Sequence, residues 1–511
     1  MSESKKDKEE NRSSNISKHK REGSVLKPPI RQMPMTPSSW KDDRMPQMLW
    51  AVLLIANLTR EEALDIFRKV GAFVMGHEAL SDVTISGIAS WPKADRVALL
   101  NLLHDSHPHA KSILQTLVLF PRLPAYKDWE EVFGNVMAGT EAQVADFLTK
   151  GVLVTLDHQS QEATDCRWVK VFCLILTGKF SMPRSMGSPI VNYPNEGDMR
   201  EVRPSIRASE ISFPAEASEW PEDFWKACLQ TTLCAPMPRE EQRRDKIKIT
   251  NTQVNRARHL LLLHFLKTDN SSAIDAKHDT IFGTGFYVLR LLDEMVVTNL
   301  SRGAVGRLTL RSCVESFITL AYLIKKDDSN IWNEFRNYGI GQMKLSYLKA
   351  RDSNDKPAFI DEKFLKQIAN EDRWEEFSDI ELGHWTSSTL RKLSEEAGCK
   401  DIYDAYYDWT STFSHGSWGA IRESSFAICA NPLHRLHPIP SVSVYTLPGV
   451  LEDIVKITNL VLQLIESQYP NLSLQIVHEP NPEKRSFLKE LYSRWRYKSS
   501  YKFLKFITGG K

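Results

Sequence analysis

The sequence lacks the features that mark several large protein classes. Its 511 residues contain no run of about 18 apolar residues, so a membrane-spanning helix is not expected. Residues 1–31 are polar and charged and have no apolar h-region, which argues against a secretory signal. A P-loop, a dinucleotide fingerprint and a serine-hydrolase elbow are also missing. These absences argue against membrane and secreted proteins and against common ATPases, dehydrogenases and hydrolases.

Cysteine is scarce and irregularly spaced. The seven cysteines are Cys166, Cys173, Cys228, Cys234, Cys313, Cys399 and Cys429, and none forms a C-x-x-C pair. An odd number in a long chain is typical of reduced thiols rather than of a disulfide framework. We therefore expect a cytoplasmic protein without a zinc site or any other cofactor.

Two short segments concentrate histidine. His104, His107 and His109 surround Pro108, which breaks any helical face, and no cysteine or carboxylate cluster supports them. His434 and His437 lie in an extended stretch between prolines. In both segments the pattern favours a turn or loop over a metal site.

The remaining composition is that of an ordinary soluble protein. Hydrophobic residues make up 42% of the chain and charged residues 25%, and the net charge is +2. A net charge this close to zero gives no overall electrostatic attraction to nucleic acid or to a membrane surface. Apolar residues recur mainly with helical periodicity, which predicts an all-α protein with few or no strands.

Composition shifts along the chain predict five segments. They are a disordered tail over 1–35, a helical domain over 36–180, a proline-rich irregular linker over 181–240, a helical module over 241–470 and a basic, aromatic extension over 471–511. Within the first domain, Thr59 and Glu62 have the spacing of a capping box that opens a helix. Within the module, Ile402, Tyr406, Trp409 and Phe413 recur at spacings of 4, 3 and 4, which predicts a shared apolar face.

The segment around Arg311 and Glu315 is the centre of the module. These two residues are four apart in a mostly apolar run, so on a helix they are neighbours on one face. A charged pair on an apolar stripe requires partners. It is either a structural ion pair between helices or part of a site in which Arg311 holds an anionic oxygen such as a phosphate.

Ser414 and His415 follow a predicted helix over 402–413. At a helix C-terminus the dipole favours the imidazolium form, which makes His415 a candidate general acid. Ser414 is a candidate hydrogen-bond donor or, alternatively, a nucleophile. The alternative is that both residues only cap the end of the helix.

The order of these motifs is similar to that of the DUF5677 family. The resemblance rests on Phe286–Asp293, Arg311-x3-Glu315, Phe335-x2-Tyr338-Gly339 and Tyr406…Phe413-Ser-His-Gly416, and it covers about residues 279–420. The family's functions are unknown, and the resemblance implies a bacterial helical protein comparable to the HEPN-like domains of toxins and phage-defence systems. It also implies that Arg311, Glu315, Ser414 and His415 are the site residues. The R-x(4–6)-H spacing of HEPN ribonucleases does not occur at His415.

The C-terminal extension is basic and aromatic. Residues 483–511 interleave Lys and Arg with Phe, Tyr and Trp, and Arg494, Trp495, Arg496 and Lys498 are the candidate nucleic-acid-binding residues. Such a mixture can neutralise phosphates and stack on bases. It also suits an anionic membrane surface or a helical extension that packs on the protein's own surface.

Two classes of function follow from these patterns. The first is an effector of phage defence or of a toxin-like system that acts on RNA or another phosphate-bearing ligand. The second is a non-enzymatic helical scaffold, binding protein or nucleic-acid sensor. A homo-oligomer or a defence-system partner protein is compatible with either.

Overall fold

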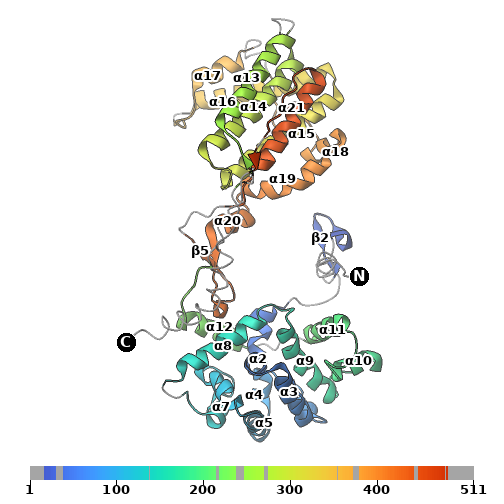
Figure 1. Cartoon of the computed structure of the whole chain (residues 1–511), viewed down its shortest axis with the longest axis vertical. Coiled ribbons are helices and arrows are strands. Elements are labelled where there is room, and N and C mark those ends of the chain that lie inside the picture. The colour runs from blue at the N-terminus through green and yellow to red at the C-terminus, as the bar shows by residue number, and fades with distance from the viewer. Residues whose placement is uncertain are drawn as a thin grey trace. The chain divides into compact units, whose positions relative to one another are not determined.

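The computed structural model describes residues 16–29, 38–136, 139–213, 218–237, 245, 247–269, 274–353, 355–371, 379–441, 447–477 and 479–480. Among these residues helices predominate and strands are few and short, which confirms the all-α prediction (Figure 1). The strands described are short and lie in two-stranded pairs: β1 (Lys20–Glu22) with β2 (Val25–Lys27), β3 (Ile247–Lys248) with β6 (Glu479–Pro480), and β4 (Phe426–Ile428) with β5 (Pro438–Pro440). The chain folds into two compact units, each with its own apolar core.

The first unit comprises the described residues up to Met237 and the later segment Ile428–His437. Its α-helices are α2 (Leu49–Asn57), α3 (Arg60–Val74), α4 (Ile85–Ser90), α5 (Lys93–Asp105), α6 (Ala110–Leu114), α7 (Tyr126–Phe133), α8 (Glu141–Thr155), α9 (Gln161–Leu176), α10 (Arg184–Val191), α11 (Met199–Ser212) and α12 (Trp220–Thr231). Short helical turns are η1 (Ile16–Lys18), η3 (Trp40–Arg44), η4 (Pro46–Met48), η5 (Glu78–Leu80), η6 (Gln115–Leu119) and η8 (Pro432–His434).

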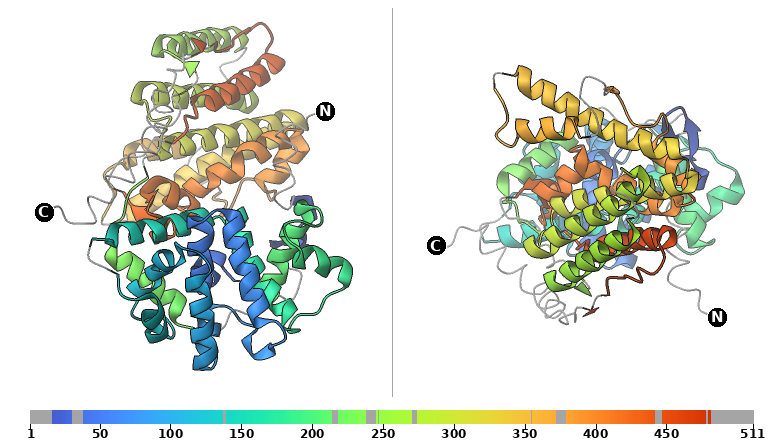
Figure 2. Two further views of the ribbon diagram at one scale, coloured as in Figure 1. Left: turned by 60° about the horizontal axis from the view of Figure 1, so that its bottom comes forward. Right: turned by 90° about the horizontal axis from the view of Figure 1, so that it is seen from above.

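Helix α2 is the centre of the first unit. It is apolar around nearly its whole circumference, and a helix of that kind must be covered on all sides. Helices α3, α8 and α9 pack against it, and the views in Figure 2 show this unit from two further directions. Thr59 accepts from the backbone of Glu62 while the Glu62 side chain accepts from Thr59, so the predicted capping box opens α3.

The second unit comprises the described residues from 245 to 427 and from 438 to 480. Its α-helices are α13 (Asn251–Thr268), α14 (Ala276–Thr298), α15 (Ala304–Lys326), α16 (Ser329–Asp352), α17 (Glu362–Ala369), α18 (Leu390–Ala397), α19 (Lys400–Ser414), α20 (Trp418–Ser425) and α21 (Leu451–Gln468). Helix α15 lies at its centre and packs against α14, α18, α19 and α21. Along the described parts of the chain, no helix is both long and apolar enough to cross a bilayer.

The segment predicted as an irregular linker over 181–240 is instead largely helical and belongs to the first unit. Two of its prolines lie where a missing N–H costs little: Pro183 is an N-cap and Pro221 is in a first turn. Pro189 and Pro204 lie inside α10 and α11, so these helices form despite them. Val202 and Ile206 of α11 are buried, and α11 packs against α9. Burial of this apolar face outweighs the proline-rich composition.

Two further boundaries differ from the predicted ones. The segment Ile428–His437, expected within the module over 241–470, is part of the first unit, and Leu433 lies in that unit's core. Residues 20–27, expected within a disordered tail, form the antiparallel hairpin of β1 and β2. Gly23 makes this turn possible because its φ of 61° is accessible to glycine without steric cost.

Candidate ligand-binding groove

Arg311 lies on α15 and joins two helices. Its Nε donates to Oε1 of Glu315, one turn later on the same helix, at 2.8 Å. Its Nη2 donates to the hydroxyl of Tyr407 on α19 at 2.9 Å, and its guanidinium lies 4.6 Å from the centroid of the Tyr407 ring. The predicted neighbour relation between Arg311 and Glu315 is therefore present, and the pair connects α15 to α19.

The two partners of this ion pair differ in exposure. The side chain of Arg311 is 13% exposed, whereas that of Glu315 is 39% exposed. Nη1 of Arg311 is buried without a hydrogen-bond partner. The arginine is thus mainly committed to packing and to its two bonds, while the carboxylate faces outward with Oε2 available.

A groove of about 430 Å³ lies on the same side of α15 as Glu315. Helices α14, α15 and α16 line it with Thr280, Gly283, Thr284, Tyr287, Glu315, Ser316, Thr319, Leu320, Leu323 and Phe335. Its volume is in the range of pockets that bind small molecules. Among the described lining residues, Glu315 is the one charged side chain, and the other polar groups are hydroxyls.

Ser414 and His415 do not join this groove. Helix α19 runs antiparallel to α15, because Arg311 contacts Tyr407 whereas Arg307, one turn earlier, lies 5.8 Å from the ring centroid of Phe413. His415 is eight residues beyond Tyr407, about 12 Å along a helix axis. Ser414 and His415 are both exposed. The structure thus brings Arg311 and Glu315 together and places Ser414 and His415 beyond the other end of the contact.

The candidate nucleic-acid-binding residues belong to the C-terminal extension. Arg494, Trp495, Arg496 and Lys498 lie outside the described residues, so their role in nucleic-acid binding stays a prediction.

Comparison with known proteins identifies one segment of the chain. Residues 295–428 match the family model of DUF5677, a family of unknown function. This segment is similar to DUF5677, and all but its last residue lies in the second unit, which is called the DUF5677 module below. The match confirms the predicted resemblance and extends it to Ile428, while the predicted start at about residue 279 precedes the matched start at Met295. No curated protein and no solved structure matches the chain.

The sequence did not indicate the groove residues on α14 or the partner Tyr407. These side chains come close to the Arg311–Glu315 pair only through the packing of α14, α15 and α19, so no local spacing identifies them.

The structure also brings together Cys234, Cys429, His434 and His437 in the first unit, where no metal site was expected. The signal within the later segment is C-x4-H-x2-H, and its fourth member precedes it by nearly two hundred residues.

Replacing Arg311 is expected to destabilise the DUF5677 module, and replacing His415 is not. Arg311→Ala removes the Tyr407 bond, the Glu315 pair and a packed side-chain stem, which together contribute about 1–2 kcal/mol. His415→Ala removes an exposed side chain and should change the free energy of unfolding by less than about 0.5 kcal/mol. Urea unfolding of both variants measures this difference. Equal destabilisation would show that His415 has a structural role that its exposure does not indicate.

Proposed function

We propose that the DUF5677 module is a non-enzymatic binding module whose groove between α14, α15 and α16 holds a small ligand. The observation that supports this most directly is the Glu315 carboxylate, which forms one wall of the groove while Arg311 fixes it through Oε1. A fixed carboxylate with a free oxygen is an acceptor for an N–H donor. Acid–base catalysis by Glu315 with His415 has no comparable support, because the two residues are not in reach of each other.

The chemistry of the lining favours a nucleoside that carries an exocyclic amine. Tyr287 and Phe335 provide aromatic surfaces on which a base can stack. Carboxylates accept from the exocyclic amine of cytosine. Thr280, Thr284 and Thr319 provide hydroxyls for a sugar. The ligand class is therefore cytidine or a related amino-nucleoside.

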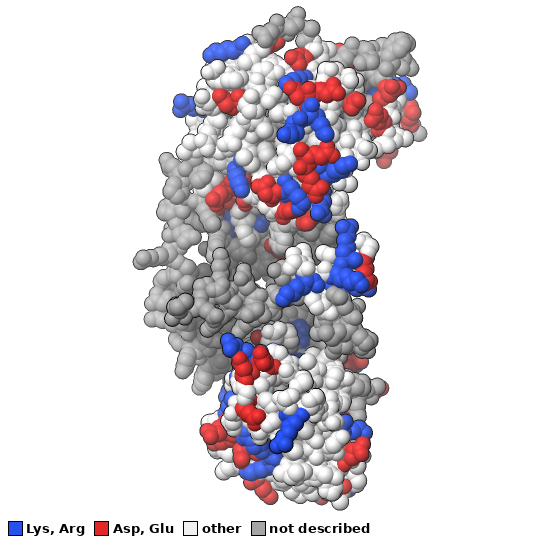
Figure 3. Space-filling model, turned by 90° about the vertical axis from the view of Figure 1, so that its right-hand side faces the viewer, with Lys and Arg blue, Asp and Glu red and all other residues white. Residues whose placement is uncertain are grey.

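Phosphate recognition is less well supported by this groove. No Lys or Arg occurs among its described lining residues, and the guanidinium of Arg311 already pairs with Glu315 and Tyr407. On the face seen in Figure 3, basic and acidic side chains of the second unit are intermixed. Ion pairs in that unit include Lys326–Glu396. Intermixed charge gives no extended positive surface for a polyanion. Action on RNA in phage defence stays a prediction of the sequence.

Glu315→Gln is expected to weaken cytidine binding by about tenfold or more. The substitution keeps the shape of the side chain and removes the charge that strengthens the hydrogen bond, a loss of about 1.5–3 kcal/mol. Isothermal titration calorimetry of the full chain with cytidine and with uridine measures the effect. Uridine, which lacks the exocyclic amine, should bind weakly to wild type and variant alike.

Glu294→Gln is the matched control. Glu294 accepts from Nε of Arg290 one turn earlier on α14 at 2.8 Å, the same pairing as Arg311–Glu315, but outside the groove. It should leave cytidine binding unchanged. Absence of cytidine binding by the folded wild type would contradict the nucleoside proposal. Cleavage of cellular RNA by the wild type but not by His415→Ala would contradict the non-enzymatic proposal.

A further inference from the structure

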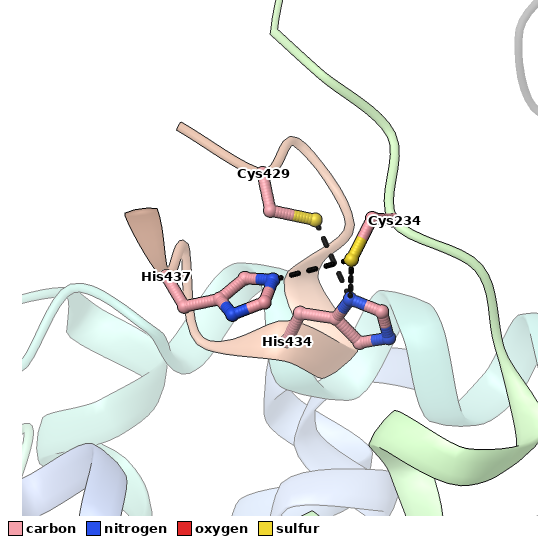
Figure 4. Close-up of side chains that lie close together, drawn as sticks. All are labelled: Cys234, Cys429, His434 and His437. Carbon is pink, nitrogen blue, oxygen red and sulfur yellow. Dashed lines mark hydrogen bonds between the residues drawn. The ribbon is translucent and has the colours of Figure 1, made fainter. Parts of the chain in front are cut away.

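Four side chains with metal-binding atoms converge in the first unit. Cys234 comes from the segment that follows α12, whereas Cys429, His434 and His437 come from the returning segment Ile428–His437 (Figure 4). Their ligand atoms all lie within 4.8 Å of one another. Two thiols and two imidazoles are the donor set of a Cys2His2 zinc site.

The distances agree with tetrahedral coordination. Sγ of Cys234 lies 3.4 Å from Nδ1 of His434 and 3.3 Å from Nε2 of His437, and Sγ of Cys429 lies 3.4 Å from the same Nδ1. Zinc bonds of about 2.3 Å to sulfur and about 2.0–2.1 Å to nitrogen place tetrahedral S and N ligands about 3.5–3.6 Å apart. The observed separations differ from that value by only a few tenths of an ångström.

Backbone pairing holds the two segments in this register. The N–H of Met237 donates to the carbonyl of Ile428, and the N–H of Ala430 donates to the carbonyl of Ala235. Cys429 and Pro236 form an isolated antiparallel bridge between these bonds. The two cysteines therefore lie on paired strands of backbone, where their side chains can approach.

The turn between the two histidines has a strained backbone. Arg435 and Leu436 both have φ of 55°, a left-handed conformation that is sterically unfavourable for residues other than glycine. Arg435 is held there by an ion pair with Asp42 at 2.7 Å and by stacking over Trp225. Such strain persists where the surroundings impose it, and it is common at functional sites. Here it brings His434 and His437 to the same side.

Hydrogen bonds around His434 leave Nδ1 free to bind a metal. The hydroxyl of Thr232 lies 2.7 Å from the carbonyl of Cys228, to which it donates, and 2.8 Å from Nε2 of His434. Because the hydroxyl proton is used, Thr232 accepts from Nε2–H of His434. Nδ1 then carries the lone pair, and it is the atom that faces both sulfurs. An N–H from Ala235 also points at Sγ of Cys429, at 3.4 Å. Metal ligands characteristically have outer partners of this kind.

We propose that Cys234, Cys429, His434 and His437 bind one structural Zn²⁺ ion. Four protein ligands fill the tetrahedral coordination shell, so the ion has a structural rather than a catalytic role. It would join the chain where it leaves the first unit to the segment where it returns, and so hold Leu433 in the core. This site is independent of the groove in the DUF5677 module.

The test is the metal content of the full chain. Protein purified under reducing conditions and dialysed against zinc-free buffer is expected to contain about one zinc per chain by mass spectrometry. After exchange with cobalt, thiolate-to-cobalt charge transfer and tetrahedral d–d absorption bands are expected. Cys234→Ser and His437→Ala should each retain less than a tenth of the zinc. Neither residue is fully buried, so both variants should fold, as circular dichroism will verify.

Two matched substitutions complete the experiment. Cys399→Ser and His415→Ala change the same residue types outside the cluster and should keep the wild-type zinc content. Folded wild-type protein that holds no zinc even after incubation with zinc would overturn the proposal. So would a Cys234–Cys429 disulfide found by mass spectrometry in protein purified under reducing conditions, because both thiolates are needed for the metal.

Discussion

Glu210→Gln should lower the free energy of unfolding of the first unit by about 3–5 kcal/mol, the range expected when a buried ion pair loses one partner. Glu210 on α11 accepts from Nη1 of Arg44 at 2.5 Å and lies 3.4 Å from Nζ of Lys170. Arg167 approaches its second oxygen at 3.7 Å. These four side chains are at most 10% exposed. Glutamine keeps the volume of the side chain and leaves three buried cations without a counter-charge.

The pKa of Arg167 shows that burial disfavours the charged form of one of these cations. Burial lowers the pKa of Arg167 to about 10, although Glu210 opposes this shift. Glu201→Gln on the exposed face of the same helix is the control, with an expected change below about 1 kcal/mol. Urea unfolding followed by circular dichroism compares the two variants. A loss at Glu210 no larger than that at Glu201 would mean that the cations rearrange to reach water.

Trp332→Ala should destabilise the second unit by a similar amount, about 3–5 kcal/mol, the usual cost of emptying a buried aromatic site. Trp332 is 2% exposed at the start of α16. Its Nε1 donates to Oδ1 of Asp327 at 3.2 Å, and Asp327 also pairs with Lys277 of α14 at 2.7 Å. The indole thus fills the core and connects the junction of α15 and α16 to α14.

Trp409→Ala is the matched control in the same unit. Its indole is 62% exposed on α19, so removal should change stability by less than about 1 kcal/mol. Scanning calorimetry of the full chain compares the midpoints. A comparable fall for both variants would show that Trp409 is covered in solution by a surface that the single chain does not provide.

The fold class was predictable because it depends on local patterns. Helical periodicity and the capping box at Thr59 and Glu62 involve residues three or four apart, and both predictions are confirmed. The apolar stripe over 402–413 was only partly correct: Ile402 is buried, but Trp409 is largely exposed. Periodicity identifies a face of a helix, whereas the extent of its burial depends on neighbours that the local sequence does not specify.

The same distinction applies to the sites. Arg311 and Glu315 are one turn apart, so their contact could be predicted, whereas the placement of Glu315 on a groove depends on how α14 and α16 pack. The proline count over 181–240 suggested a linker because composition alone does not show that Val202 and Ile206 are buried against the first unit. Cys234 and Cys429 are separated by almost the whole second unit, and no spacing rule covers that separation.

The return of Ile428–His437 to the first unit has a consequence for the order of synthesis. Leu433 is part of the core of the first unit, but the ribosome makes the residues from 238 to 427 before it makes that leucine. At about 5–20 residues per second, this interval is roughly 10–40 s. The core formed by helices α2 to α12 therefore lacks Leu433 while most of the second unit is being synthesised. The first unit can therefore complete its core only after Ile428–His437 has been made.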